Sequence, residues 1–225
     1  MEATICSDAH DNFEAFSLLK QKPFLFLGDI YTNQKLIDLF FGTVLKFYKN
    51  QANKEEVIMM FKNNILDIKR SIIDRDIPDF FKKNEVYILP GNHEDKLFFE
   101  KLTKLPNIKN LHNKKIMLGD TEIVGHGGFF LPSEEMKIDN FFWFSDSEIA
   151  NNLQNLNPGK NCVIMMHELP LQDYCKQTRA VIENIKPRFV LGCHNHKDEG
   201  EKQINSIKYI NCGALTYNKF KVIDL

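Results

Sequence analysis

The sequence lacks the features of a membrane protein and of an exported protein. No apolar run approaches the roughly 20 residues that a transmembrane helix needs. Residues 1–16 carry acidic side chains where a secretory signal has positive charge followed by a long apolar stretch. The five cysteines are odd in number and show no CxxC spacing, which favours reduced thiols. We therefore expect a cytoplasmic protein with no membrane partner.

The sequence also lacks an excess of charge of either sign. The 29 lysines and arginines are balanced by 30 aspartates and glutamates, so the net charge is −1. Proteins that bind a nucleic-acid backbone rely on clustered lysine and arginine, and the lysine pairs at 82–83 and 114–115 are too short to supply such a cluster. We therefore do not expect a nucleic-acid partner. Because 43% of the 225 residues are hydrophobic, the chain can bury a core without disulfides.

The hydrophobic pattern favours an α/β fold in one domain over residues 1–225. Short apolar runs that are typical of buried strands alternate with segments of helical period, such as residues 12–20 and 145–156. A long, charged, helical stretch at about 36–75 predicts a helical insertion, which either covers a sheet or shapes a substrate cleft. The expected strands are 3–6, 24–27, 86–89, 122–124, 163–166, 189–191, 208–210 and 220–223.

Five of the seven histidines directly follow an expected strand. A single histidine in such a place is more often a hydrogen-bonded surface or core group, but the joint pattern favours a metal site. Ligands in layered α/β proteins bind at the carboxyl ends of strands, where loops converge. Oxygen and imidazole ligands without thiolates suit manganese, iron or zinc. The histidines are His10, His93, His167, His194 and His196, and they occur with Asp8, Asp29 and Asn92.

The order and spacing of these motifs, from residue 8 to about 214, resemble the calcineurin-like metallophosphoesterase superfamily. The resemblance implies a two-layer β-sandwich flanked by helices, in four layers α/β/β/α, with two metal ions at its apex. The most specific motif is GNHE. The motifs are Asp8-Ala9-His10, Gly28-Asp29, Gly91-Asn92-His93-Glu94, His167 and Gly192-Cys193-His194-Asn195-His196.

The resemblance also implies a role for each of eight side chains. One carboxylate bridges two divalent ions, three side chains complete each ion's ligand set, and one histidine faces the phosphate and protonates the leaving oxygen or stabilises its charge. Manganese is the favoured metal for both ions, with iron or zinc as alternatives. The reaction is in-line attack of a metal-bound hydroxide on a small phosphomonoester or phosphodiester. In this assignment Asp29 is the bridging carboxylate and His93 faces the phosphate. One ion is completed by Asp8, His10 and His196, and the other by Asn92, His167 and His194.

Two motifs depart from those of related branches. Phosphoprotein phosphatases read GDxxDR where this chain has Thr32 and Asn33 in place of the acid and the arginine, which argues against protein phosphatase activity. His167 begins HELP, which lacks one proline of the family's HxPP motif. His126, in a GHGG sequence, is therefore a rival for this position. We favour His167 because a strand–helix–strand stretch follows the GHGG sequence before the final motif.

Several other residues near the motifs have a functional and a structural interpretation. Cys193 and Cys212 are either redox-sensitive or small buried hydrophobes, and we favour the latter. The aromatic run 141–144 either stacks a base or packs under a loop, and we favour packing. We expect His112 to be solvated. Three basic residues could help to hold an anion, but we assign none of them: Arg179, Arg188 and Lys197.

Two other functions remain as alternatives to a phosphoesterase. A non-catalytic metal-binding interaction module on the same fold typically loses ligand residues or the histidine of GNHE, whereas this chain retains them. A nuclease would need more clustered positive charge than the sequence provides. We therefore expect a small phosphorylated substrate. Loops at residues 30–80 and 126–146 are where substrate choice is expected to reside.

Overall fold

The computed structural model describes residues 1–20, 22–32, 38, 55–56, 59, 75–131, 137 and 141–225. The chain divides into two compact units, of which the first comprises Met1–Tyr31 and Ile77–Leu225 and the second Thr32–Asp76. Most of the second unit lies outside the described residues, and with it the helical insertion that the sequence predicts at about 36–75. All the elements below belong to the first unit.

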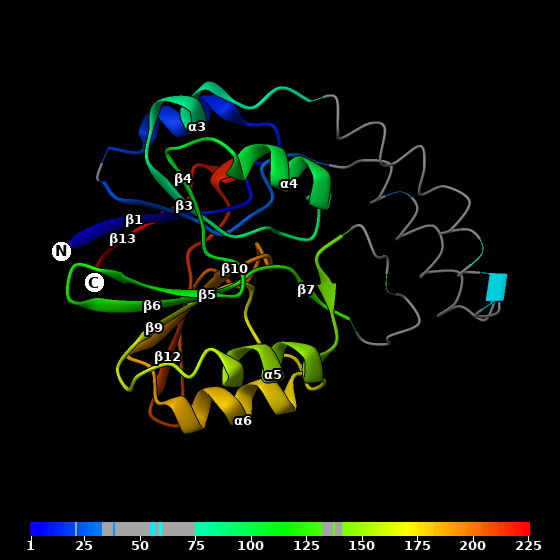
Figure 1. Cartoon of the computed structure of the whole chain (residues 1–225), viewed down its shortest axis with the longest axis vertical. Coiled ribbons are helices and arrows are strands. Elements are labelled where there is room, and N and C mark those ends of the chain that lie inside the picture. The colour runs from blue at the N-terminus through cyan, green and yellow to red at the C-terminus, as the bar shows by residue number, and fades with distance from the viewer. Residues whose placement is uncertain are drawn as a thin grey trace. The chain divides into compact units, whose positions relative to one another are not determined.

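The first unit contains two sheets (Figure 1), and the described part of one of them has five strands. The four strands β1 to β4 run parallel, and β13 pairs with β1 in the antiparallel direction at one edge. Parallel strands share the edge at which their carboxyl ends emerge. In spatial order the strands are β13 (Lys221–Asp224), β1 (Glu2–Cys6), β2 (Phe24–Phe26), β3 (Val86–Ile88) and β4 (Ile108–Asn110).

The second sheet has six strands in the described residues. Its four central strands are parallel, and each edge strand pairs with its neighbour in the antiparallel direction. A short separate ribbon is formed by β7 (Phe129–Phe130) and β8 (Trp143–Phe144). In spatial order the strands of the sheet are β11 (Gly200–Ile204), β12 (Ile207–Asn211), β10 (Phe189–Cys193), β9 (Val163–Glu168), β6 (Thr121–His126) and β5 (Lys114–Leu118).

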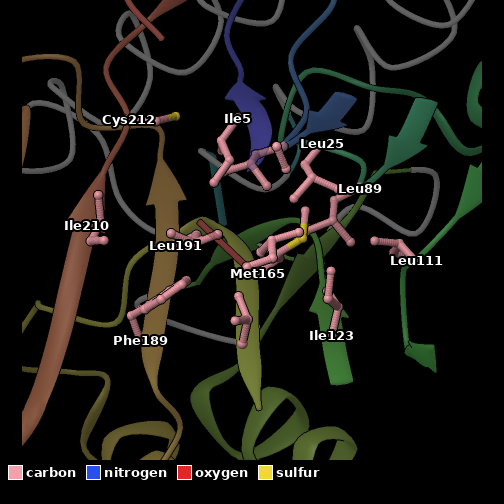
Figure 2. Packing of buried hydrophobic residues seen from close by; sticks show 14 of the residues in the cluster. Ile5, Leu25, Leu89, Leu111, Ile123, Met165, Phe189, Leu191, Ile210 and Cys212 are labelled. Atoms are coloured by element: carbon pink, nitrogen blue, oxygen red, sulfur yellow. The ribbon is translucent and has the colours of Figure 1, made fainter. Parts of the chain in front are cut away.

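The main hydrophobic core lies between the two sheets. Figure 2 shows Ile5 and Leu25 of the first sheet facing Met165 and Leu191 of the second. All four side chains are almost fully buried. Strand residues alternate between the two faces of a sheet, so one face of each sheet is directed into this core and the other face is left for helices to cover.

Helices cover the outer faces of both sheets (Figure 1). On the second sheet, α5 (Asp146–Asn155) and α6 (Lys176–Ile185) place Ile149 and Ile182 against Ile164 of β9. On the first, the 3-10 helix η1 (Phe13–Leu18) and helix α3 (Asp79–Lys83) place the rings of Phe16 and Phe81 within 5.9 and 5.3 Å of the ring of Phe26. Helix α4 (Lys96–Thr103) lies beside β4. This arrangement confirms the predicted two-layer β-sandwich flanked by helices.

The strands expected from the sequence are all present, and two helical segments can be compared with expectation. The capping box at Ser145 is present: its backbone N–H donates to the Glu148 carboxylate at 2.8 Å, and α5 follows directly. The segment expected as a helix at 12–20 is instead the 3-10 helix η1, at whose end Leu19 N–H bonds back three residues to Phe16 O. None of the described helices combines the length and the apolar character that crossing a membrane requires.

Candidate metal centre

The carboxyl ends of five strands, three from the first sheet and two from the second, bring the predicted ligands together. The loops after β1 and β2 are joined by backbone hydrogen bonds, from Asp8 N to Gly28 O at 2.8 Å and from His10 N to Asp29 O at 3.2 Å. Asn92 and His93 follow β3, His167 lies in β9, and His194 and His196 follow β10. These strands are far apart in sequence, so the cluster depends on the sandwich itself.

The first group of candidate ligands is Asp8, His10 and His196, whose ligand atoms lie within 4.8 Å of one another. Asp8 Oδ1 is 2.9 Å from His196 Nε2 and 3.4 Å from His10 Nε2. His10 Nδ1 is buried and has no hydrogen-bond partner in the described part of the chain. A buried imidazole nitrogen without a partner costs free energy unless a ligand uses it, so this group fits a cation.

The second group is Asp29, His167 and His194. His167 Nδ1 is 2.8 Å from the carbonyl oxygen of Leu27, which can only accept, so Nδ1 carries a proton and donates. In the neutral ring Nε2 then has a free lone pair. It faces Asn92 Oδ1 at 2.9 Å, Asp29 Oδ2 at 3.3 Å and His194 Nδ1 at 3.2 Å. Oxygen and nitrogen atoms that converge in this way need a proton or a metal ion between them, and the backbone bond orients the imidazole for either.

Asp29 belongs to more than one group of candidate ligands. A third group joins it to His10 and His93, again with ligand atoms within 4.8 Å of one another. Asp29 Oδ2 is 3.9 Å from His93 Nε2, and Asp29 Oδ1 accepts from His93 N at 2.9 Å. The Asp29 carboxylate, only 1% exposed, therefore belongs to two of the three candidate ligand groups.

Four candidate ligands adopt a left-handed backbone conformation that is rare for residues other than glycine. The φ angles are +54° at Asp8, +45° at His10, +59° at Asp29 and +57° at His194. Each such residue costs conformational energy and persists only where the surrounding structure holds it. Such outliers concentrate at functional sites, and here all four residues belong to the candidate ligand groups.

Glu94, the last residue of GNHE, fixes the loops that carry the ligands. Its buried carboxylate accepts hydrogen bonds from the backbone N–H groups of Asp29 at 2.8 Å, Ile30 at 2.6 Å and Gly91 at 2.5 Å. Burial, together with the charge of Asp29, raises the pKa of Glu94 to about 7. At Gly91 a Cβ atom would collide with the carboxylate of Asp29, which explains why glycine is needed there. The sequence interpretation did not assign this role to Glu94, although its motif contains it.

The two buried carboxylates of the centre are ionised and are compensated by positive charge on neighbouring imidazoles. Burial alone would raise the pKa of Asp8, but hydrogen bonds from His10 and His196 hold it well below its usual range. The charges of His167 and His93 likewise hold the pKa of Asp29 low despite burial. Although burial opposes it, the two carboxylates raise the pKa of His10 to about 9 and that of His167 to about 10. Two ionised carboxylates thus hold protons on nearby imidazoles, at positions that divalent ions can take.

The two remaining histidines lie outside the ligand groups found in the described residues. His126, the rival of His167, ends β6 with its Nε2 3.2 Å from Asn152 Nδ2. The expectation that His112 is solvated is wrong. Its ring lies 5.1 Å from that of His126 and 5.5 Å from that of Phe144, its Nδ1 accepts from Gly127 N at 3.1 Å, and burial holds its pKa well below the usual value.

The aromatic run 141–144 packs beneath the centre. Phe141, Phe142 and Trp143 are buried, as the packing interpretation expects. The indole N–H of Trp143 donates to the backbone carbonyl of Asn92 at 3.0 Å, and the ring of Phe129 lies 5.1 Å from that of His194. The β7–β8 ribbon therefore supports two residues of the second ligand set. Nothing in the sequence pattern indicated these contacts, because they join residues far apart in the chain.

The other residues singled out from the sequence have ordinary structural surroundings. Cys193 and Cys212 are each 1% exposed, and Cys193 Sγ donates to Gly213 O at 3.1 Å. Burial raises the pKa of the Cys193 thiol well above its usual value, which is the behaviour of a small buried hydrophobe. Arg179 donates to the carbonyls of the loop before α6, and the Arg188 guanidinium lies 5.2 Å from the centre of the Phe189 ring.

Comparison with known proteins gives a family and two related folds. The sequence matches the calcineurin-like phosphoesterase family over residues 1–198. No curated protein matches it. One solved structure aligns with a TM-score of 0.64 and 15% sequence identity, over 99% of this chain and 98% of the other. A second, TT1561 of Thermus thermophilus, aligns with a TM-score of 0.60 and 12% identity, over 99% and 98%. At these identities the two structures bear on the fold alone.

Proposed function

Because this chain belongs to the calcineurin-like phosphoesterase family, we propose that it hydrolyses a small phosphomonoester or phosphodiester with two divalent metal ions. Metal-dependent phosphoester hydrolysis is the general activity of that family. The observation that carries the proposal is the position of Asp29, whose buried carboxylate is shared between neighbouring groups of candidate ligands. A single shared carboxylate is what a pair of catalytic ions requires.

The side chains divide into two sets that would hold the ions. Asp8, His10 and His196 would hold one, and His167, His194 and the side-chain oxygen of Asn92 the other, with Asp29 bridging. Once bound, the ions would neutralise charge on the phosphate oxygens and lower the pKa of a water molecule so that it can act near neutral pH. We propose manganese first, with iron or zinc as alternatives, because the donors are oxygen and imidazole nitrogen without thiolate.

We assign His93 to the leaving oxygen of the substrate. Its ring lies at the junction of the two sets, 5.2 Å from the ring of His10, and its backbone N–H is bound to Asp29. Burial lowers the pKa of His93, although the charge of Asp29 opposes this effect. From this position the imidazole would donate a proton or a hydrogen bond to the oxygen that leaves phosphorus. Glu94 and Trp143 would act indirectly, by holding the loops that carry Asp29 and Asn92.

The direct test is hydrolysis of p-nitrophenyl phosphate and bis-p-nitrophenyl phosphate by the metal-free protein, the protein with Mn²⁺, and the protein with Mn²⁺ and excess chelator. We expect turnover that needs Mn²⁺ and that the chelator abolishes. Asp29→Asn should lose it, whereas Asp120→Asn, in the exposed turn between β5 and β6, should retain it.

Two results would replace the proposal. Tight binding of Mn²⁺ without turnover of either ester would favour the non-catalytic interaction module. Salt-sensitive binding and cleavage of oligonucleotides would favour the nuclease, because contacts with phosphates weaken as salt rises. The ratio of monoester to diester turnover would separate the two substrate classes that the proposal still includes.

A further inference from the structure

A pocket of about 260 Å³ opens beside His194. We call it the His194 pocket. Its apolar lining includes Phe129, Leu171 and Tyr174, and its polar lining includes Gln172, Asn195 and Asp198. These residues come from β7, from the loop between β9 and α6, and from the loop after β10. The pocket is therefore built from loops at the same strand ends that carry the candidate ligands.

We propose that the His194 pocket binds the alcohol part of the phosphoester, and that it accepts an uncharged group about the size of one ring while rejecting an anionic one. This inference rests on the proposed phosphoesterase function and adds the substrate class. Apart from His194, the lining residues are not candidate ligands, so the contribution of the pocket can be separated from that of the ions.

The position of the pocket follows from His194 itself. His194 Nδ1 lies 3.2 Å from His167 Nε2, inside the second ligand group, and the same residue lines the pocket. The ring of Phe129, on the pocket wall, lies 5.1 Å from the His194 ring. A phosphate held at the ligand groups would thus have the pocket as its neighbour, and the group attached through an ester oxygen could enter it.

The charge of the lining excludes a second anionic group. The described lining residues include Glu168 and Asp198 and neither lysine nor arginine. The Glu168 carboxylate is held in place, since it accepts from Phe130 N at 2.8 Å and from the Tyr174 side chain. An anionic group in the pocket would lie beside the Asp198 carboxylate, with no lysine or arginine in the described lining to pair with it, and it would also lose hydration. Hydrogen-bond donors such as hydroxyl or amide groups are instead matched by these oxygens.

The size of the pocket limits the group that can enter it. Pockets for drug-sized ligands usually hold about 300–1,000 Å³, so a pocket of about 260 Å³ takes a single ring or sugar rather than a peptide segment. Its aromatic and aliphatic lining suits the flat face of such a ring. The expected substrate is therefore the phosphoester of a small, neutral, partly apolar alcohol.

The first experiment compares two esters that differ only in charge, 4-carbamoylphenyl phosphate and 4-carboxyphenyl phosphate, with the Mn²⁺-loaded protein at pH 8. We expect a lower KM for the uncharged carbamoyl ester. Asp198→Asn should narrow the KM ratio by about two- to five-fold, the range for a charge interaction near the surface. The control is Asp173→Asn, an exposed residue of the loop between β9 and α6 that does not line the pocket, and it should leave the ratio unchanged.

The second experiment detects binding without turnover. 4-Hydroxybenzamide and 4-hydroxybenzoate are titrated into the ¹⁵N-labelled protein loaded with Zn²⁺, and the backbone amide shifts of Gln172, Tyr174 and Asn195 are followed. We expect saturable shifts with the benzamide and weaker binding of the benzoate. Asp198→Asn should strengthen binding of the benzoate towards that of the benzamide.

The outcomes separate the pocket from the proposed function. Turnover of both esters with an unchanged KM ratio in Asp198→Asn, and no shifts at the three amides, would overturn the pocket and leave the phosphoesterase standing. Saturable shifts with the benzamide, but no turnover of any ester, would support the pocket as a binding site and overturn the enzyme. Equal binding of benzamide and benzoate would overturn the charge selection.

Discussion

At the scale of single residues, His93 differs from the other strand-end histidines. It is a neighbour of the ligands on both sides, since its Nε2 lies 3.9 Å from Asp29 Oδ2 and its ring 5.2 Å from that of His10. Yet it is not needed to complete either of the other two ligand groups, which are Asp8, His10, His196 and Asp29, His167, His194. A histidine in this position can serve the reaction rather than hold an ion.

Replacement of His93 by alanine should therefore separate chemistry from metal binding. We expect His93→Ala to lower turnover by roughly 10²–10⁴-fold, the usual effect of losing a general acid. Two ions should remain bound per chain, as measured by elemental analysis of the purified protein. Unchanged turnover would remove His93 from the mechanism, and loss of an ion would make it a ligand.

Trp143, the single tryptophan of the chain, is expected to act on the second ion through Asn92. Trp143→Phe keeps an aromatic ring but removes the 3.0 Å hydrogen bond to the Asn92 carbonyl, an interaction typically worth about 1 kcal/mol. Calorimetric titration should show weaker binding of one ion, by several-fold, and unchanged binding of the other. Phe142→Leu, a buried neighbour without a polar atom, is the control. Equal effects of both variants would mean that general packing is responsible.

At the scale of elements, hydrogen bonds join the strand-end loops to one another. Glu94 joins the loops after β2 and β3 through three backbone hydrogen bonds. Gly128 N adds a fourth link by donating to Pro90 O at 2.8 Å. Because the loops are fixed by backbone contacts, the ligand side chains are positioned before any ion binds, which reduces the cost of ordering them on binding.

Gly91→Ala tests this close approach of loops. The added methyl group would collide with the Asp29 carboxylate, so the loops must separate and the bridging ligand must shift. We expect affinity for both ions to fall at least ten-fold, measured by competition with a fluorescent chelator, while the circular dichroism spectrum stays that of a folded protein. Gly159→Ala is the control, because its Cβ would meet only ordinary contacts. Unchanged affinity in Gly91→Ala would show that the loops are not so constrained.

The strands were predictable from the sequence because they depend on local patterns, whereas the convergence of the strand-end residues was expected from the resemblance of the motifs to a known family. An apolar run such as residues 163–166 indicates a buried strand, and the polar residue that ends it indicates a loop. The burial of His112 and the bond from Trp143 to Asn92 were not predictable, since they depend on partners far along the chain. The 3-10 geometry of η1 was likewise not predictable from its hydrophobic period.

At the scale of the whole molecule, the buried charges couple stability to pH. The pKa values of His10 and His167, about 9 and about 10, lie above the value of about 6.5 expected in the unfolded chain. Their stabilising contribution is therefore complete below about pH 6.5 and is lost as pH rises through 9 to 10. The pKa values of His194 and His126, about 3 and about 4, are lowered, so these residues destabilise the fold as pH falls below 6.5.

The stability of the metal-free protein should therefore fall on the alkaline side of pH 7. We expect its free energy of unfolding, measured by urea titration with chelator present, to fall by on the order of 5 kcal/mol between pH 7 and pH 10, as both imidazoles lose their protons. With divalent ions bound, the imidazoles are already deprotonated, so the alkaline decrease should be much smaller. His10→Gln should reduce the alkaline decrease in the metal-free protein. An equal decrease with and without ions would contradict this account.

The hydrogen bond between Asp8 and His196 spans 188 positions of sequence. Contacts of such long range form late in folding, after the entropy of closing the intervening chain has been lost. In a partly folded chain the candidate ligands are therefore far apart and bind an ion weakly, whereas in the folded protein the complete ligand set is in place. Ions that bind mainly to the finished state slow its unfolding and leave the rate of refolding unchanged. The cations would thus lengthen the lifetime of the folded state without accelerating its formation.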